Sequence, residues 1–295
     1  MQLTGARIKE VIAVERLLRS SDRNPQGAYW ADRPQLNWGV RWQHTFATGT
    51  VWFDQDDYAL RCEWGSAGIA ALAPGSDVIV VVDVLSFSTC VDVALGRGAR
   101  VYPYRYRDAS AREFAASVDA ILAGPRSYEN PSLSPASLRH LPAGARVVLP
   151  SPNGATLSWL TGSLPTLTGC LRNAAAVARA AQAYGSRIGV IPAGEQWPDG
   201  SLRPSIEDWL GAGAILSHLS GSISPEADLA REAFLRQRAN LAAVLESCTS
   251  GRELIEQGWR DDVLLATELE VSTCAPVLID HAYQDTQATG GAPAI

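Results

Sequence analysis

Five consecutive β-branched residues, Val78–Val82, form an uninterrupted apolar run. A run of this kind is typical of a strand that is buried on both faces, as in a parallel sheet. Asp83 follows directly at the carboxyl end of the strand. Beyond it, Ser88 and Thr89 suit the cap of a helix, because the apolar residues over 90–95 have helical spacing. The pattern therefore predicts a buried strand, an acid, a polar turn and a helix.

The same alternation of apolar runs and helical spacings continues along the chain. Further strands are expected over 99–104, 121–123, 146–150, 164–171, 187–192 and 274–279, and an extended pair or hairpin over 50–64. Helices are expected over 65–74, 109–120, 157–160, 173–184 and 205–219, and two or three more over 225–269. Strands that alternate with helices predict an α/β fold. The expected architecture is a three-layer α/β/α domain with a largely parallel or mixed central sheet and additional C-terminal helices.

The two ends of the chain differ from the segment between them. Residues 1–48 combine a short apolar spacing over 8–18 with a segment rich in turn residues and tryptophan. We expect 1–48 to be a weakly ordered N-terminal extension, 49–284 a single α/β domain, and 285–295 a disordered tail. Within the domain, the proline-containing segment 128–145 has little periodicity, and such long loops tend to cover functional sites.

Composition narrows the classes of function. The chain has 295 residues, of which 46% are hydrophobic, so it can bury a large core. A net charge of −6 disfavours a nucleic-acid-binding surface. Lys9 is the single lysine, so arginine must supply any anion-binding cation. The five cysteines are odd in number and widely spaced, which argues against a disulfide scaffold or a structural zinc site.

Membrane segments are not expected either. No apolar run approaches the roughly 20 residues that a helix needs to cross a bilayer, and the chain start lacks the apolar segment of a signal peptide. We therefore expect a cytoplasmic protein with no membrane or nucleic-acid partner. Nothing in the pattern excludes a homo-oligomer.

Polar side chains gather where the predicted strands end. In an open α/β sheet, ligands bind beyond the carboxyl ends of the strands, so residues that follow different strands meet in one pocket. Glu207 and Asp208 open the helix that follows the last of these ends. The residues at the strand ends are Asp83 with Ser86, Ser88 and Thr89; Arg126 with Asn130; Asn153 and Gly154 with Thr156; and Glu195, followed by Arg203 in a loop.

The acids among these residues suit a magnesium ion, because no cluster of histidine or cysteine accompanies them. A metal ion together with arginine and amide donors suits a phosphoryl group, whose charge must be neutralised as the leaving oxygen departs. We expect Asp83, Glu207 and Asp208 to hold the metal, and Asp83, Asn153 and Glu207 to be catalytic. The expected contacts to a small phosphorylated acid are Ser86, Ser88, Thr89, Arg126, Asn130, Gly154, Thr156, Glu195 and Arg203.

Plain structural roles compete with these assignments. Asp83 can simply cap the amides of the following turn, and Glu207 can complete a capping box with Ser205. His140, in the long loop, is a candidate general acid. A haloacid-dehalogenase-like enzyme is a further alternative, but such enzymes carry a second acid where this chain has Leu85. The G-x-S-x-G, G-x-x-x-x-G-K-[ST] and H-E-x-x-H motifs are absent.

Four motifs in order carry a family resemblance: VVDVLSFST from Val81, SPNGAT from Ser151, AGE with RPSIEDWLGAGAI from Ala193, and SGRELIEQGWRDDVLLATEL from Ser250. Together they span about residues 53–278 and resemble the 2-phosphosulfolactate phosphatase family. The resemblance implies a three-layer, magnesium-dependent phosphatase that converts 2-phosphosulfolactate to sulfolactate and phosphate. By position, Asp83, the Asn153–Gly154 turn and the Glu207–Asp208 pair correspond to the family's motif residues.

This chain also departs from the family pattern. Ser86 stands where family members commonly have arginine, Pro125 where they commonly have glutamate, and Pro152 and Ala155 flank the Asn153–Gly154 turn. Serine cannot replace the two-pronged contact of arginine with an anion. Arg126 and Arg203 are the candidates to compensate for it. The alternative function is therefore a non-catalytic protein that binds a small phosphorylated anion on the same scaffold.

Overall fold

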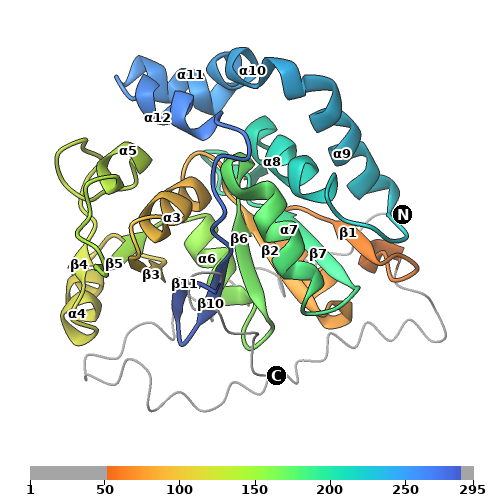
Figure 1. Ribbon diagram of the computed structural model, residues 1–295, viewed down its shortest axis with the longest axis horizontal. Helices are drawn as coiled ribbons and strands as arrows, with labels where there is room; N and C mark the ends of the chain where they lie inside the picture. The colour runs from red at the N-terminus through yellow and green to blue at the C-terminus, as the bar shows by residue number, and fades with distance from the viewer. Residues whose placement is uncertain (1–51, 287–295) are drawn as a thin grey trace. The chain divides into compact units, whose positions relative to one another are not determined.

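The computed structural model describes residues 52–286, which form one α/β unit around a nine-stranded sheet (Figure 1). The strands, in spatial order, are β1 (Leu60–Cys62), β7 (Ile188–Pro192), β2 (Val78–Val82), β6 (Thr166–Gly169), β10 (Pro276–Ile279), β11 (Ala282–Asp285), β3 (Arg100–Tyr104), β5 (Arg146–Pro150) and β4 (Ile121–Leu122).

The sheet consists of two parallel groups that an antiparallel hairpin joins. Strands β1, β7, β2 and β6 are parallel neighbours, and so are β3, β5 and β4. The hairpin β10–β11 lies between the groups and meets β6 and β3 through one paired residue each, Val277 with Leu167 and Tyr283 with Val101. The central sheet is therefore mixed, and the expected fold class is confirmed.

The apolar run of β2 is explained by the two layers that cover it. Val78, Val80 and Val82 belong to one core cluster, which includes residues of the helices α7 (Ala174–Gln182) and α8 (Ile206–Leu216). Ile79 and Val81 point to the opposite cluster, with residues of α2 (Gly65–Leu72) and α6 (Gly154–Leu160). Because side chains alternate across a strand, burial on both faces requires apolar residues at every position.

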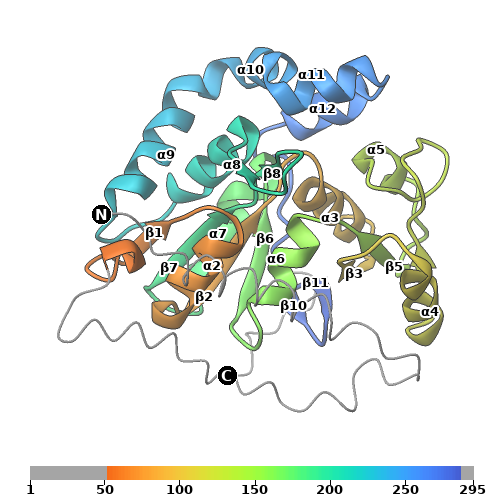
Figure 2. The ribbon, with the colours of Figure 1, turned by 180° about the vertical axis from the view of Figure 1, so that it is seen from behind.

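The remaining helices extend these layers. Figures 1 and 2 show α9 to α12 running past α8 and α3 at one end of the sheet. Their bounds are α3 (Phe87–Leu95), α4 (Ala109–Ser117), α5 (Pro135–Leu138), α9 (Pro225–Gln237), α10 (Leu241–Ser247), α11 (Thr249–Glu256) and α12 (Arg260–Ala266); the short hairpin β8 (Glu195–Gln196) with β9 (Leu202–Arg203) follows β7.

Two local predictions were wrong, and one strand was missed. The segment 50–64 is not a hairpin, because 52–54 form a 3₁₀ turn and β1 pairs in parallel with β7. Helix α3 begins at Phe87 with Ser86 in the cap position, so Ser88 and Thr89 lie inside its first turn. The pattern also missed β11, which continues to Asp285.

The predictions made for residues 1–48, and those for the tail beyond residue 286, lie outside the described residues. Between residues 52 and 286, none of the helices has both the length and the apolarity that a bilayer crossing requires.

Candidate active site

Asp83 lies where the amino ends of two helices meet. Its Oδ1 accepts a hydrogen bond from the N–H of Phe87 at 3.0 Å, and its Oδ2 accepts one from the N–H of Gly154 at 2.8 Å. These are the first residues of α3 and α6, whose amino ends favour negative charge. The side chain is buried, with 5% of its residue surface exposed. One carboxylate therefore ties together turns that are 71 residues apart in sequence.

Gly154 is required by the close approach of α6 to this acid. A Cβ atom at position 154 would lie 2.4 Å from a ring carbon of Phe87 and 2.8 Å from Oδ2 of Asp83. Both distances are shorter than real contacts allow, so any side chain would push the helix away from Asp83. The Asn153–Gly154 turn thus has a steric reason for its glycine.

Asp208 joins the ends of two neighbouring strands next to Asp83. Its Oδ1 accepts from the N–H of Val84 at 2.7 Å, and its Oδ2 accepts from the N–H of Gly194 at 2.9 Å. Helix α8 can approach so closely because Gly211 packs directly on Val82 and Val84. The expected proximity of the pair 207–208 to Asp83 is therefore observed, and both oxygens of Asp208 are engaged by the backbone.

Glu207 and Glu195 complete a cluster of four acids. Glu207 is buried, and its Oε2 accepts from the thiol of Cys248 at 3.5 Å. The predicted capping box is wrong, because the Ser205 side chain makes no cap hydrogen bond and lies 3.5 Å from the carbonyl oxygen of Arg203. Glu195 accepts from the side-chain amide of Asn153 at 3.0 Å. The acids thus come from the ends of β2 and β7 and from α8.

Burial and mutual repulsion act together on these carboxyls. Burial, followed by the charges of Glu195 and Glu207, raises the pKa of Asp83, although its two backbone hydrogen bonds act in the opposite direction. The pKa of Asp208 is raised by burial and by the charges of Glu207 and Asp83. The pKa of Glu195 is also raised, mainly by burial, against the lowering effects of Asn153 and Arg203. Perturbed acids of this kind gather at functional sites.

The four acids could attract a cation, but they do not form a complete set of metal ligands. Among the ion pairs within residues 52–286, none involves Asp83, Glu195, Glu207 or Asp208. The same residues contain no set of three or more acids, histidines or cysteines arranged to hold a metal. Magnesium commonly takes only one or two carboxylates and keeps its waters, so the donor chemistry fits that ion.

Two arginines flank the acid cluster. Arg126 donates from Nη1 to Asp262 at 2.6 Å and from Nη2 to the hydroxyl of Ser86 at 3.2 Å. Arg203, at the end of β9, donates to the hydroxyl of Ser250 at 3.3 Å and stacks over Trp197. The segments carrying both arginines are remote in sequence from Asp83, yet both reach the same end of the sheet.

The other predicted residues lie in different surroundings. Ser88 and Thr89 are fully buried, with their hydroxyls bonded to Thr168 and to the carbonyl oxygen of Val84. The structure therefore provides no support for the phosphate contacts expected of them. Thr156 is half-buried in the first turn of α6, whereas Asn130 and His140, both within the segment 128–145, are exposed.

Sequence reasoning missed Asp262, which the structure places behind Arg126. It is fully buried on α12 and also accepts from the hydroxyl of Ser134 at 2.6 Å. A signal was present, because position 262 shares a helix face with the apolar Leu265 and Ala266, both buried. An acid on an apolar face indicates a buried partner.

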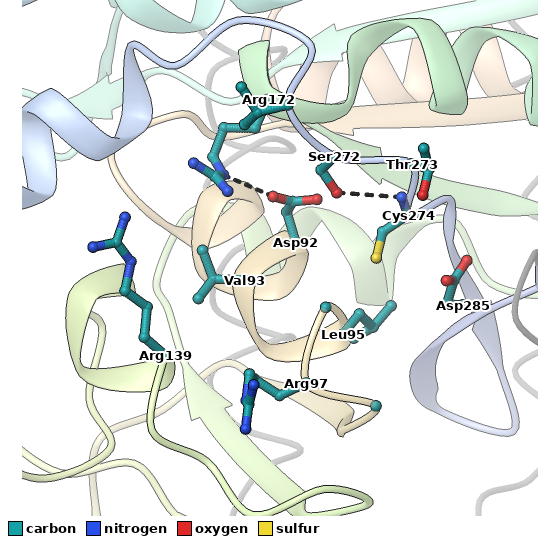
Figure 3. A pocket seen from close by; sticks show the side chains of 13 residues that line it. Asp92, Val93, Leu95, Arg97, Arg139, Arg172, Ser272, Thr273, Cys274 and Asp285 are labelled. Atoms are coloured by element: carbon teal, nitrogen blue, oxygen red, sulfur yellow. Dashed lines mark hydrogen bonds and ion pairs between the residues drawn. The ribbon is translucent and has the colours of Figure 1, made fainter.

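A separate pocket of about 650 Å³ lies along the outer side of α3 (Figure 3). Its lining includes Asp92, Arg97, Arg139, Arg172 and Cys274. Asp92 accepts from Nε of Arg172 at 2.8 Å, which Figure 3 shows as a dashed line. None of the four clustered acids lines this pocket, so we place the candidate active site at Asp83 and not here.

Comparison with known proteins identifies the family of this chain. A family model described as 2-phosphosulpholactate phosphatase matches residues 70–281, which include all four acids. A probable 2-phosphosulfolactate phosphatase of Gloeobacter violaceus is 30% identical over 215 residues, covering 68% of this chain and 87% of the relative. The 2-phosphosulfolactate phosphatase of Methanothermobacter thermautotrophicus is 29% identical over 210 residues, covering 70% and 88%. The chain therefore belongs to the 2-phosphosulfolactate phosphatase family.

Proposed function

We propose that this protein is a phosphoric monoester hydrolase that releases phosphate from 2-phosphosulfolactate or a closely similar phosphorylated acid. The observation that carries the proposal is the cluster of Asp83, Glu207 and Glu195. The first two are buried and the third is half-buried, and Asp83 lies at the amino ends of two helices. Paired acids of a purely structural kind would be compensated by arginine. The names of the relatives supply the substrate class.

Magnesium is the proposed cofactor, with Asp83 and Glu207 as its protein ligands. When bound, it would neutralise the repelling carboxylates and polarise the phosphoryl oxygens of the substrate. Asp208 is assigned a positioning role, because its oxygens hold the N–H groups of Val84 and Gly194 and thereby fix the end of β2, which carries Asp83. Its proposed contribution is to fix the position of Asp83.

The remaining residues bind and orient the ester in this proposal. Asn153 is fixed by Glu195, so its amide group has a defined direction at the start of α6. The raised pKa of Glu195 favours its protonated form, which can give a proton to the departing alkoxide. Ser86 and the guanidinium groups of Arg126 and Arg203 supply donors for the negative charges of the substrate.

Phosphate release from the purified protein tests this function. We expect turnover of 2-phosphosulfolactate with magnesium and its loss when EDTA removes divalent cations. A panel of other small phosphomonoesters defines how narrow the substrate class is. Absence of phosphate release from every ester, at several magnesium concentrations, would contradict the proposal.

A non-catalytic phosphoanion-binding protein is the second candidate. The observation that favours it is that both oxygens of Asp83 already accept backbone hydrogen bonds. A thermal-shift series with 2-phosphosulfolactate distinguishes the two candidates. Stabilisation by the ligand without phosphate release would support the binding protein.

A further inference from the structure

We propose that Arg126 selects substrates carrying a second acidic group besides the phosphate, and that Asp262 is the positioning residue that holds the Arg126 guanidinium for this purpose. The inference rests on the proposed function and adds the residue that sets its substrate class.

Asp262 is a buried anchor that several segments share. The residue has no exposed surface, and its two oxygens accept three hydrogen bonds: Oδ2 from Arg126 at 2.6 Å, and Oδ1 from the Ser134 hydroxyl at 2.6 Å and the Ala136 N–H at 3.2 Å. Helix α12 thereby fixes both the segment that follows β4 and the start of α5. A guanidinium bonded to such an anchor loses little further freedom when a ligand binds.

The guanidinium of Arg126 is oriented from two further directions. Its Nη2 donates to the Ser86 hydroxyl at 3.2 Å, and its central carbon lies 5.9 Å from the ring centroid of Trp259. Tyr128 packs edge-on against Trp259. The Arg126 side chain still has 18% of its surface exposed. An arginine that is fixed, charged and open on one side is a recognition group for a carboxylate or sulfonate.

Arg126 lies on the Ser86 side of the acid cluster, because its Nη2 donates to the Ser86 hydroxyl in the turn after Asp83. Arg203 lies on the Glu195 side, because the two residues are paired in the β8–β9 hairpin. A phosphate held at the acid cluster thus has Arg203 on the Glu195 side, and the rest of the substrate can extend toward Arg126 on the Ser86 side.

A second buried pair in the same chain offers a matched control. Arg172 bonds Asp92 at 2.8 Å, and it also donates to the carbonyl oxygen of Leu265 and to Glu268. Its charge therefore faces two carboxylates, whereas the charge of Arg126 faces one carboxylate and a neutral hydroxyl. Both pairs link distant segments, but only the pair containing Arg126 contacts the turn after Asp83.

The experiment compares three esters in wild type, R126Q, D262N and the double variant. The esters are 2-phosphosulfolactate, 2-phospholactate, which lacks the sulfonate, and p-nitrophenyl phosphate, which lacks a second acid. In R126Q we expect the KM for 2-phosphosulfolactate to rise about 10- to 100-fold, more than its kcat falls, because one charge-assisted contact is lost. The ratio of kcat/KM between 2-phosphosulfolactate and p-nitrophenyl phosphate should fall by about tenfold or more. The kinetics with 2-phospholactate show whether Arg126 recognises the carboxylate or the sulfonate.

Asp262 should act only through Arg126. D262N is expected to raise the same KM by a smaller factor, and the double variant should match R126Q, because removing the anchor matters only while the guanidinium is present. A further loss of selectivity in the double variant would overturn the positioning role. D92N serves as the control, with a lowered melting temperature and an unchanged selectivity ratio. R126K keeps the positive charge but lacks the two-pronged geometry of the guanidinium. It replaces R126Q if R126Q does not fold.

Failure of this inference can be told apart from failure of the proposed function. Equal losses of kcat/KM for esters with and without a second acid would show that Arg126 acts on the phosphate, while the hydrolase assignment would stand. If the wild type releases no phosphate from any ester, calorimetry still compares binding of 2-phosphosulfolactate to wild type and R126Q. Equal affinities there would overturn the role of Arg126 independently.

Discussion

Helix α3 lies between two regions whose buried acids have different partners. On its outer side, Asp92 lies in the pocket of Figure 3 and is paired with Arg172. At its amino end, Asp83 meets backbone N–H groups and other acids, and none of the described ion pairs includes it. Burial raises the pKa of both carboxyls, but only Asp92 has an arginine that opposes the effect.

The difference indicates which region serves the fold and which serves chemistry. A buried carboxylate next to an arginine has its charge compensated, as Arg172 compensates Asp92. Several buried carboxylates without a cation cost stability, and such a cost persists in proteins where function requires it. The pocket beside α3 is therefore the structural region, and the acid cluster is the candidate site.

The largest effect is expected for Asp83→Asn. The variant keeps the size of the side chain but removes the charge that the proposed magnesium site needs, so phosphate release should fall by about 1000-fold or more. The measurement is phosphate release from 2-phosphosulfolactate with magnesium. Asp77→Asn is the matched control, since Asp77 precedes the same strand and accepts from the N–H of Arg187 at 2.8 Å. Full activity of D83N would remove Asp83 from the mechanism.

Gly154→Ala should have the next largest effect, because it displaces α6 from Asp83. The added methyl would overlap Phe87 and Oδ2 of Asp83, at 2.4 and 2.8 Å. We expect a loss of about 1–3 kcal/mol in the free energy of unfolding and a clear fall in kcat. Gly96→Ala is the control at the other end of α3, where the new Cβ would meet only ordinary contacts of 3.4 Å or more. Equal kcat values for the two variants would contradict the steric argument.

The elements that the sequence predicted best are those whose pattern depends on burial alone. Val78–Val82 forms β2 with the predicted bounds, because covering both faces leaves no polar position. Strand β11 could not be found in this way, since Ala282–Asp285 mixes apolar and polar residues and is placed by tertiary contacts. Tyr283, for example, packs edge-on against Phe87 and bonds the hydroxyl of Ser158.

The candidate site was predictable where residues follow strands directly. Asp83, Gly154 and Asp208 meet as expected, because strand ends and the following helix starts converge. The roles of Ser88 and Thr89 were not predictable, since the helix already starts at Phe87 and both hydroxyls turn inward. Asp262 lies 136 residues from Arg126, and no local pattern connects them.

A smaller effect is expected in the pH dependence of stability. Burial and acidic neighbours raise the pKa of Asp83 from 3.8 to about 7. In metal-free protein, the folded state thus binds a proton that the unfolded state has lost, and the free energy of unfolding falls as pH rises between these values. Melting curves in EDTA should show a shallower decline for D83N than for wild type. Parallel declines would contradict the raised pKa, and added magnesium should restore stability above about pH 7.

The smallest effect on turnover is expected for Asp92→Asn, although it breaks a buried ion pair. Asparagine still accepts a hydrogen bond from Arg172, and Arg172 retains Glu268, so we expect a loss of about 1–3 kcal/mol in the free energy of unfolding. Because α3 holds Asp83 through the N–H of Phe87 and not through Asp92, kcat and KM should stay within about twofold of wild type. Denaturant unfolding and steady-state kinetics on the same preparation check both statements. A fall in kcat comparable to that of G154A would mean that the pocket and the acid cluster act as one site, and the separation drawn between the two sides of α3 would have to be abandoned.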